Sequence, residues 1–191
     1  SYMKTDGTTD DAQAIALDET MTSLSEGWYF VGKDINYTQT VTLTGDVTII
    51  LCNGKTMTVN TTDNAMGING NTNSKNLTIY GQTAQGGTLS VTADGEGIWC
   101  QNITINSGTV NVTASRYRTI CVDVLVTING GVVTATNTNS ALYAICSSQS
   151  SQNGGVSING GQVTATGNGG NIHADYITFG YTNASDFITF N

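Results

Sequence analysis

The sequence contains a ten-residue segment that recurs without gaps, and this recurrence sharply limits the folds open to the chain. Three copies align directly, at residues 103–112 (ITINSGTVNV), 126–135 (VTINGGVVTA) and 156–165 (VSINGGQVTA). Looser copies begin at Val47, Leu77 and Ile177. Successive copies start 21 to 30 residues apart. Repeats of this length are typical of solenoid proteins, in which each repeat packs only against its neighbours.

Apolar and polar residues alternate within each copy, and this pattern predicts β-strands rather than helices. In the second copy, Val126, Ile128 and Val133 are expected to point one way and Thr127 the other. The Asn-Gly-Gly or Asn-Ser-Gly between the two strands is too short for a helix and suits a bend. A third apolar element follows in each unit, centred on Ile68, Ile98, Ile120, Ile145 and Ile172.

Three short strands per repeat predict an all-β fold, specifically a right-handed, single-stranded parallel β-helix of about six turns. Equivalent residues of successive turns would then stack about 4.8 Å apart. We expect an inward column and a corner ladder of side chains, formed respectively by Ile105, Ile128 and Ile158 and by Asn106, Asn129 and Asn159. A β-sandwich also uses short strands and glycine-rich turns, but it does not require repetition in register, so the β-helix is preferred.

The composition agrees with this fold and excludes several functions. The chain has 23 Gly and no Pro, only 10% of its residues are charged, and its net charge is -8. Lys and Arg are too few to bind nucleic acid or to form a polybasic membrane anchor. No apolar run approaches the roughly 20 residues that span a bilayer. We therefore expect a soluble protein with no nucleic-acid partner and no membrane insertion.

The two ends of the chain differ from its middle. Residues 1–27 lack the repeat and are predicted to form an N-terminal tail and cap, with the β-helix over residues 28–191. Residues 187–190 are expected to close the other end of the β-helix. No signal peptide is expected in this chain, and its start is interpreted as that of a mature fragment.

Several segments resemble known bacterial proteins. Residues 27–31 and 39–59 resemble a module common in repetitive surface proteins of gut-dwelling bacteria. Residues 87–98 and 103–108 are similar to β-helices of gut and soil bacteria that bind acidic polysaccharide, such as polygalacturonate, with calcium. Residues 6–11 look like the start of pectin-degrading and phage tailspike β-helices. These resemblances imply a secreted or cell-surface location and carbohydrate binding.

Three carboxylates are candidate calcium ligands. Asp94 and Glu96 precede the third strand of one repeat, and Asp123 follows the equivalent strand one turn later. Calcium takes six to eight oxygen ligands, which backbone carbonyls or Asn side chains would complete. The alternative is that these residues are solvated loop acids.

An exposed aromatic surface is predicted beside these acids. Trp99 lies between Ile98 and Cys100, which should point inward, so its indole should point outward and offer a platform for a sugar ring. Tyr117 would extend the platform. Neighbouring loops covering the indole are the alternative.

Arg116 and Arg118 form the one concentrated basic pair and are candidate ligand-binding residues. A polysaccharide lyase needs a base and a positive charge to stabilise an enolate, so the pair keeps a lyase open. The alternative role for these arginines is to neutralise neighbouring acids. His173, the sole histidine, has no partner nucleophile and is predicted to be a surface residue.

The cysteines and threonines bear on chemistry and on surface properties. The cysteines are Cys52, Cys100, Cys121 and Cys146. They contain no Cys-x-x-Cys pair, which argues against zinc or thioredoxin-like chemistry. Cys121 and Cys146 are expected to stack on adjacent turns, where a disulfide is geometrically permitted but the reduced state is preferred. An outward Thr column suggests an ice-binding solenoid, which the variable repeat length disfavours.

The sequence thus predicts a non-catalytic, secreted or surface-displayed carbohydrate-binding or adhesin module, with calcium assisting the binding of an acidic polysaccharide or glycoconjugate. A bridging cation is required by this hypothesis because the protein itself is acidic. The alternatives are an architectural spacer in a larger adhesin and a polysaccharide lyase.

Overall fold

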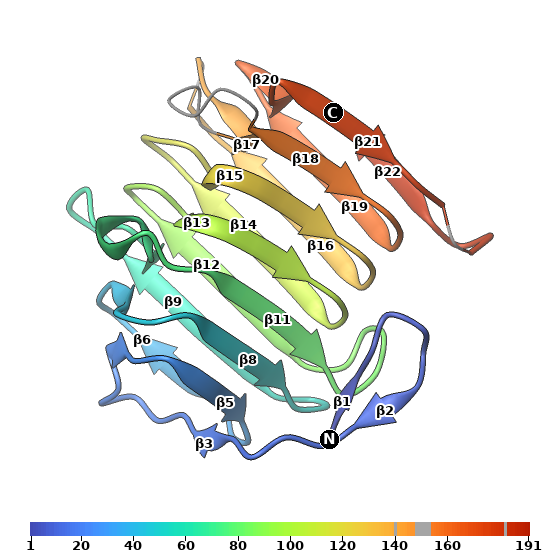
Figure 1. Ribbon diagram of the computed structural model, residues 1–191. Helices are drawn as coiled ribbons and strands as arrows, with labels where there is room; N and C mark the ends of the chain where they lie inside the picture. The colour runs from blue at the N-terminus through green and yellow to red at the C-terminus, as the bar shows by residue number, and fades with distance from the viewer. Residues whose placement is uncertain (140, 148–153, 182) are drawn as a thin grey trace.

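The computed structural model describes residues 1–139, 141–147, 154–181 and 183–191, and the described chain is all-β. Its strands form a 13-stranded sheet, here called the large sheet, a 7-stranded second sheet and a two-stranded N-terminal hairpin. Strands pair in parallel within the large sheet and within the second sheet, and the chain passes repeatedly from one sheet to the other (Figure 1). This arrangement is compatible with a β-solenoid.

The strands are short, as the alternating sequence predicts. The large sheet contains β3 (Ile15–Ala16), β4 (Ser23–Leu24), β5 (Gly27–Val31), β7 (Val41–Leu43), β8 (Val47–Leu51), β10 (Ile68–Asn69), β11 (Leu77–Gly81), β13 (Ile98–Ile105), β15 (Ile120–Ile128), β17 (Tyr143–Ser147), β18 (Gly155–Ile158), β20 (Gly170–His173) and β21 (Tyr176–Phe179). The second sheet contains β6 (Ile35–Tyr37), β9 (Thr56–Thr61), β12 (Thr88–Ala93), β14 (Thr109–Ala114), β16 (Val132–Asn137), β19 (Gln162–Gly167) and β22 (Phe187–Phe190). The hairpin is β1 (Tyr2–Met3) with β2 (Thr9–Asp10), and a 3-10 turn, η1, covers Asn71–Asn73.

The register of the strands confirms the predicted inward column. Ile105 pairs with Ile128, which pairs with Ile158, and all three side chains are buried. The third apolar elements also stack, because Ile98, Ile120 and Ile145 pair in turn. These columns contribute to one apolar core between the sheets.

The sequence predicted that the third apolar element of each repeat forms a separate strand, but this is not always so. In β13 and β15, the third element runs directly into the first strand of the next copy. The register shifts between Cys100 and Asn102, at an irregularity of the β-bulge type that lets one long strand serve two positions of the repeat.

The asparagine ladder is present at the corner between the two sheets. The Asn129 Nδ2 donates to Asn106 Oδ1 at 2.8 Å, and the Asn159 Nδ2 donates to Asn129 Oδ1 at 2.8 Å. Gly131 turns the chain beside the ladder with φ of 84°, a left-handed conformation that glycine adopts at little cost.

The two ends of the stack differ in how they cover the core. At the N-terminal end, β3 and β4 pair with β5 and β7, and Leu17 and Leu24 are buried. At the other end, Ile177, Phe179 and Phe190 are 40%, 50% and 50% exposed. Residues 187–190 form the last strand of the second sheet, and Ile188 packs against the core as expected, whereas Phe187 and Phe190 stay exposed. No helix in the described part of the chain has the length and apolarity to cross a membrane.

Candidate functional site

The seven residues singled out from the sequence lie along one edge of the stack. Asp94 and Glu96 lie between β12 and β13, and Trp99 is in β13. The arginines and Tyr117 lie between β14 and β15, whereas Asp123 is in β15. Because β13 pairs with β15 and β12 with β14, these loops are neighbours in space.

Asp94 is used to join three successive repeats. Both of its carboxylate oxygens accept the Arg116 Nε at 2.9 Å, the Ser115 hydroxyl donates to Oδ1 at 2.8 Å, and the Asn64 backbone N–H donates to Oδ2 at 3.0 Å. The Asn64 N–H and the Ser115 hydroxyl, with Arg116, hold the Asp94 pKa below its ordinary value. This carboxylate therefore has a structural role in the loops.

Glu96 and Asp123 lie in different surroundings from Asp94. Glu96 is buried, and desolvation raises the pKa of its carboxyl group, while the charge of Arg118 acts in the opposite direction. Asp123 accepts a hydrogen bond from the Trp99 indole Nε1 at 3.1 Å. Across the described residues, no three His, Cys, Asp or Glu side chains form a group that could hold a metal ion. The predicted ligands Asp94, Glu96 and Asp123 are thus not brought together as a metal centre.

The predicted aromatic platform is divided between two environments. Trp99 is half-buried and is held by Asp123, whereas Tyr117 is 47% exposed on its loop. Arg116 is engaged with Asp94, which matches the neutralising role considered for the arginines. His173 is partly buried, and its ring stacks on Tyr143 with a centroid separation of 4.4 Å.

We expect Asp94→Asn to lower the melting temperature equally in calcium and in EDTA, because it removes the ion pair with Arg116 rather than a metal ligand. The lowered pKa means that the charged form stabilises the folded state at pH values above about 3.8, the ordinary value, and that this contribution is lost as the pH falls through the folded-state pKa. Thermal denaturation at pH 7 and pH 3 measures both effects. The deficit of the variant should shrink at pH 3.

The matched control for this prediction is Glu26→Gln, which removes the charge of an exposed carboxylate and should leave the melting temperature nearly unchanged. A calcium-dependent rise in wild-type melting temperature that Asp94→Asn abolishes would show instead that Asp94 is a metal ligand.

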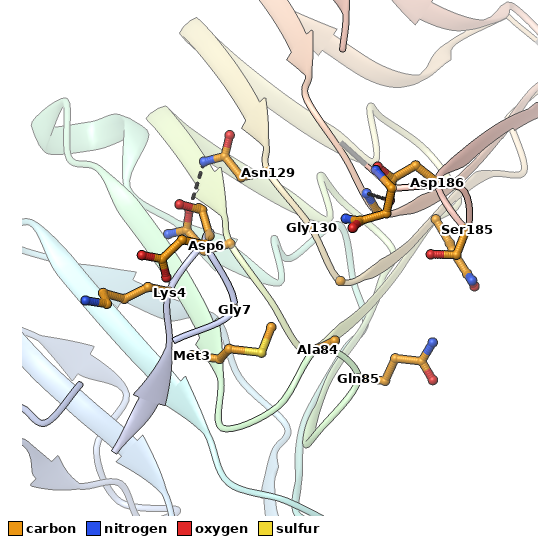
Figure 2. Close-up of a pocket in the computed structure, with 16 residues that line it drawn as sticks. Met3, Lys4, Asp6, Gly7, Ala84, Gln85, Asn129, Gly130, Ser185 and Asp186 are labelled. Atoms are coloured by element: carbon orange, nitrogen blue, oxygen red, sulfur yellow. Dashed lines mark hydrogen bonds between the residues drawn. The ribbon is translucent and has the colours of Figure 1, made fainter. Parts of the chain in front are cut away.

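A polar groove lies elsewhere, at the asparagine corner, and has a volume of about 230 Å³. In Figure 2, Lys4, Asp6 and Gly7 of the N-terminal hairpin lie on one side, and Ser185 and Asp186 lie on the other. Met3, Thr5 and Asn183 also line the groove, and the floor comes from the bends of successive repeats and the start of β19, at Ala84, Gln85, Asn106, Asn129, Gly130, Gly131, Gly161 and Gln162. We call this the corner groove.

The wall of the corner groove that the N-terminal hairpin forms is held in place by residues far from it in the sequence. The Ser107 hydroxyl donates to the Met3 carbonyl at 3.1 Å. The Tyr2 ring packs against the stacked rings of Trp28 and Tyr80, with centroid separations of 5.0 and 4.5 Å. These contacts hold the hairpin against the outer side of the large sheet (Figure 1).

The groove presents carboxylates and amides together. Asp6 accepts the Thr8 hydroxyl at 2.6 Å and the Thr8 N–H at 2.9 Å, which lowers the pKa of Asp6. Asp186 accepts the backbone N–H groups of Gly161 and Asn183 at 2.9 and 2.8 Å. Carboxylates accept hydrogen bonds, and amides both donate and accept them, so the lining suits a ligand rich in hydroxyl groups.

The asparagine ladder and residues 6–11 were each noted in the sequence, but the sequence did not predict that parts of both line the same groove. The signal available was the corner itself, where bends with Asn and Gly recur. No family model matches the chain, and no curated protein or solved structure matches it.

Proposed function

We propose that this chain is a non-catalytic, secreted or surface-displayed glycan-binding module built on a right-handed, single-stranded parallel β-helix of about six turns. The corner groove is its binding site. The observation that carries the proposal is the lining of the groove, where amide side chains, glycine backbone and two carboxylates converge. Sugar hydroxyls donate and accept hydrogen bonds, as this mixture of groups requires.

The size of the corner groove favours a short stretch of glycan. Its volume of about 230 Å³ lies below the roughly 300–1,000 Å³ typical of pockets for drug-sized ligands. A groove of this size suits a single sugar ring, with the rest of the glycan extending into solvent. The groove is lined by the bends of several repeats, so neighbouring hydroxyl groups of the sugar would contact neighbouring repeats.

The charges of the groove favour a neutral glycan. Asp6 and Asp186 supply negative charge and Lys4 supplies positive charge, in a protein of net charge -8. A carboxylate-bearing glycan would be repelled unless a cation intervened. The acidic polysaccharide expected from the sequence therefore becomes the second ligand class to test, in the presence of calcium.

An architectural spacer is a second candidate function. It is favoured by the in-register pairing of β9, β12, β14, β16 and β19, whose six-residue strands stack without a shift. Such stacking gives a regular, stiff body and requires no ligand.

A glycan array, run with calcium and with EDTA, tests the proposal. We expect wild-type protein to bind a neutral glycan in both conditions, and the double variant Gln85→Ala/Gln162→Ala to bind about tenfold more weakly, because two hydrogen-bonding amides are lost. Neither side-chain amide makes a hydrogen bond within the described residues, so the folded state should be retained.

Gln39→Ala is the matched control, since Gln39 is exposed and lies outside the groove lining. Equal loss in the control and in the double variant would contradict binding in the corner groove. Absence of binding to every glycan on the array would favour the spacer function. Binding lost in EDTA would favour the acidic ligand with calcium, and an unsaturated product would identify a lyase.

A further inference from the structure

Two cysteines form a closed pair on neighbouring strands of the large sheet. Cys121 in β15 and Cys146 in β17 are direct partners in the parallel register, as predicted. Their exposed fractions are 0% and 1%, and both thiols are free. Neither belongs to the apolar core cluster, although their chain neighbours Ile120 and Ile145 do. The thiols are therefore sealed from solvent on the outer side of the sheet, apart from the core.

The surroundings of this thiol pair are polar and aromatic. On one side the register places Trp99 beside Cys121, and on the other it places His173 beside Cys146. The charged groups that act on the pair are Arg118, Glu96 and Asp123. A hydrogen bond between the two thiols lowers the pKa of Cys121 and raises that of Cys146, while Arg118 favours the charged form of both.

We propose that Cys121 and Cys146 form a two-coordinate site for a soft monovalent metal cation of the Cu(I) type. Thiolates are the ligands that select Cu(I). Direct partners on adjacent strands have Cα atoms about 4.8 Å apart, so side chains on the same face of the sheet bring both sulfur atoms within reach of one cation. The same Cα spacing also permits a disulfide, but both cysteines are free in the structure.

The binding step is a proton exchange without a redox change. The cation binds both sulfur atoms and each thiol releases its proton, so that Cu(I) and two thiols give a dithiolate complex of charge -1 and two protons. The Arg118 guanidinium, which already acts on both sulfur atoms, stabilises this charge. The pair supplies two sulfur ligands, whereas the calcium hypothesis used the oxygen atoms of Asp94, Glu96 and Asp123.

The test is an anaerobic titration of the reduced protein with Cu(I) held in its coloured bicinchoninate complex, followed by native mass spectrometry. We expect the wild-type protein to withdraw one Cu(I) per chain. Cys121→Ser and Cys146→Ser should each abolish this uptake. Cys52→Ser and Cys100→Ser are the matched controls and should retain it, since neither residue belongs to the pair.

Circular dichroism and melting curves establish that each variant is folded before it is titrated. Failure of the folded wild-type protein to withdraw Cu(I), or equal uptake by the folded Cys121→Ser and Cys146→Ser variants, would overturn the proposal. A protein 2 Da lighter, with Cys121 and Cys146 linked in one peptide pair after gentle purification, would also overturn it, because a disulfide offers no thiolate. The glycan-binding proposal does not depend on any of these results.

Discussion

Gly131→Ala is expected to destabilise the protein by about 3 kcal/mol or more, whereas Gly54→Ala should cost only about 1–2 kcal/mol. Both glycines have left-handed φ values, 84° at Gly131 and 67° at Gly54. A Cβ at Gly131 would lie 2.4 Å from the carbonyl oxygen of Gly108 on the preceding repeat, while a Cβ at Gly54 meets nothing within 4 Å. The difference between the variants isolates the close approach of two backbones.

Urea or guanidinium denaturation, read by circular dichroism, measures both free energies of unfolding. Equal losses in the two variants would mean that the corner relaxes freely and that repeats are not packed backbone to backbone there. Because Gly131 also lines the corner groove, Gly131→Ala is unsuitable as a test of glycan binding.

Ile128→Ala should reduce the free energy of unfolding by about 2–5 kcal/mol, because it leaves a cavity in the middle of an apolar column. Ile128 is completely buried between Ile105 and Ile158 on the neighbouring strands. Thr127→Ala, one residue away on the outward side, should change stability by roughly 0.5 kcal/mol or less. The same denaturation experiment compares them, and comparable losses would show that residue 128 does not face the core.

The columns and the corner ladder were predictable from the sequence because both follow from repetition. Alternation with a period of two assigns each side chain to a face, and gapless copies fix which residues become partners. Ile105, Ile128 and Ile158 therefore stack, and Asn129 contacts Asn106 and Asn159. The pairing of Cys121 with Cys146 was predictable for the same reason.

The arrangement of the loop residues was not predictable in this way. Loops differ in length between repeats, so position in the sequence does not determine which groups a loop side chain meets. Asp94, Glu96 and Asp123 lie close together in the sequence pattern, yet Asp94 is bound by Arg116 and Asn64 from neighbouring loops. The hydrogen bonds that these loops offer determine the surroundings of Asp94.

The corner groove was hidden for a different reason. One of its walls is the N-terminal hairpin, which has no counterpart in the repeat, and the hydrogen bond from Ser107 to Met3 joins residues 104 positions apart. A contact of that separation leaves no periodic trace in the sequence. Besides the recurring Asn and Gly of the corner, the sequence offers one further signal, the aromatic residues Tyr2, Trp28 and Tyr80 that anchor the hairpin.

The exposed rung formed by β20, β21 and β22 has a consequence for how such a protein can lengthen during evolution. Among the described residues no strand pairs with the outer edge of this rung, where Ile177, Phe179 and Phe190 are exposed, so a further copy of the ten-residue segment would find a template already in register. Each added copy would bury the rung before it and present a new one. Growth by gene duplication at this end therefore demands no redesign of the existing interior, whereas the closed end built from β3 and β4 would first have to be displaced.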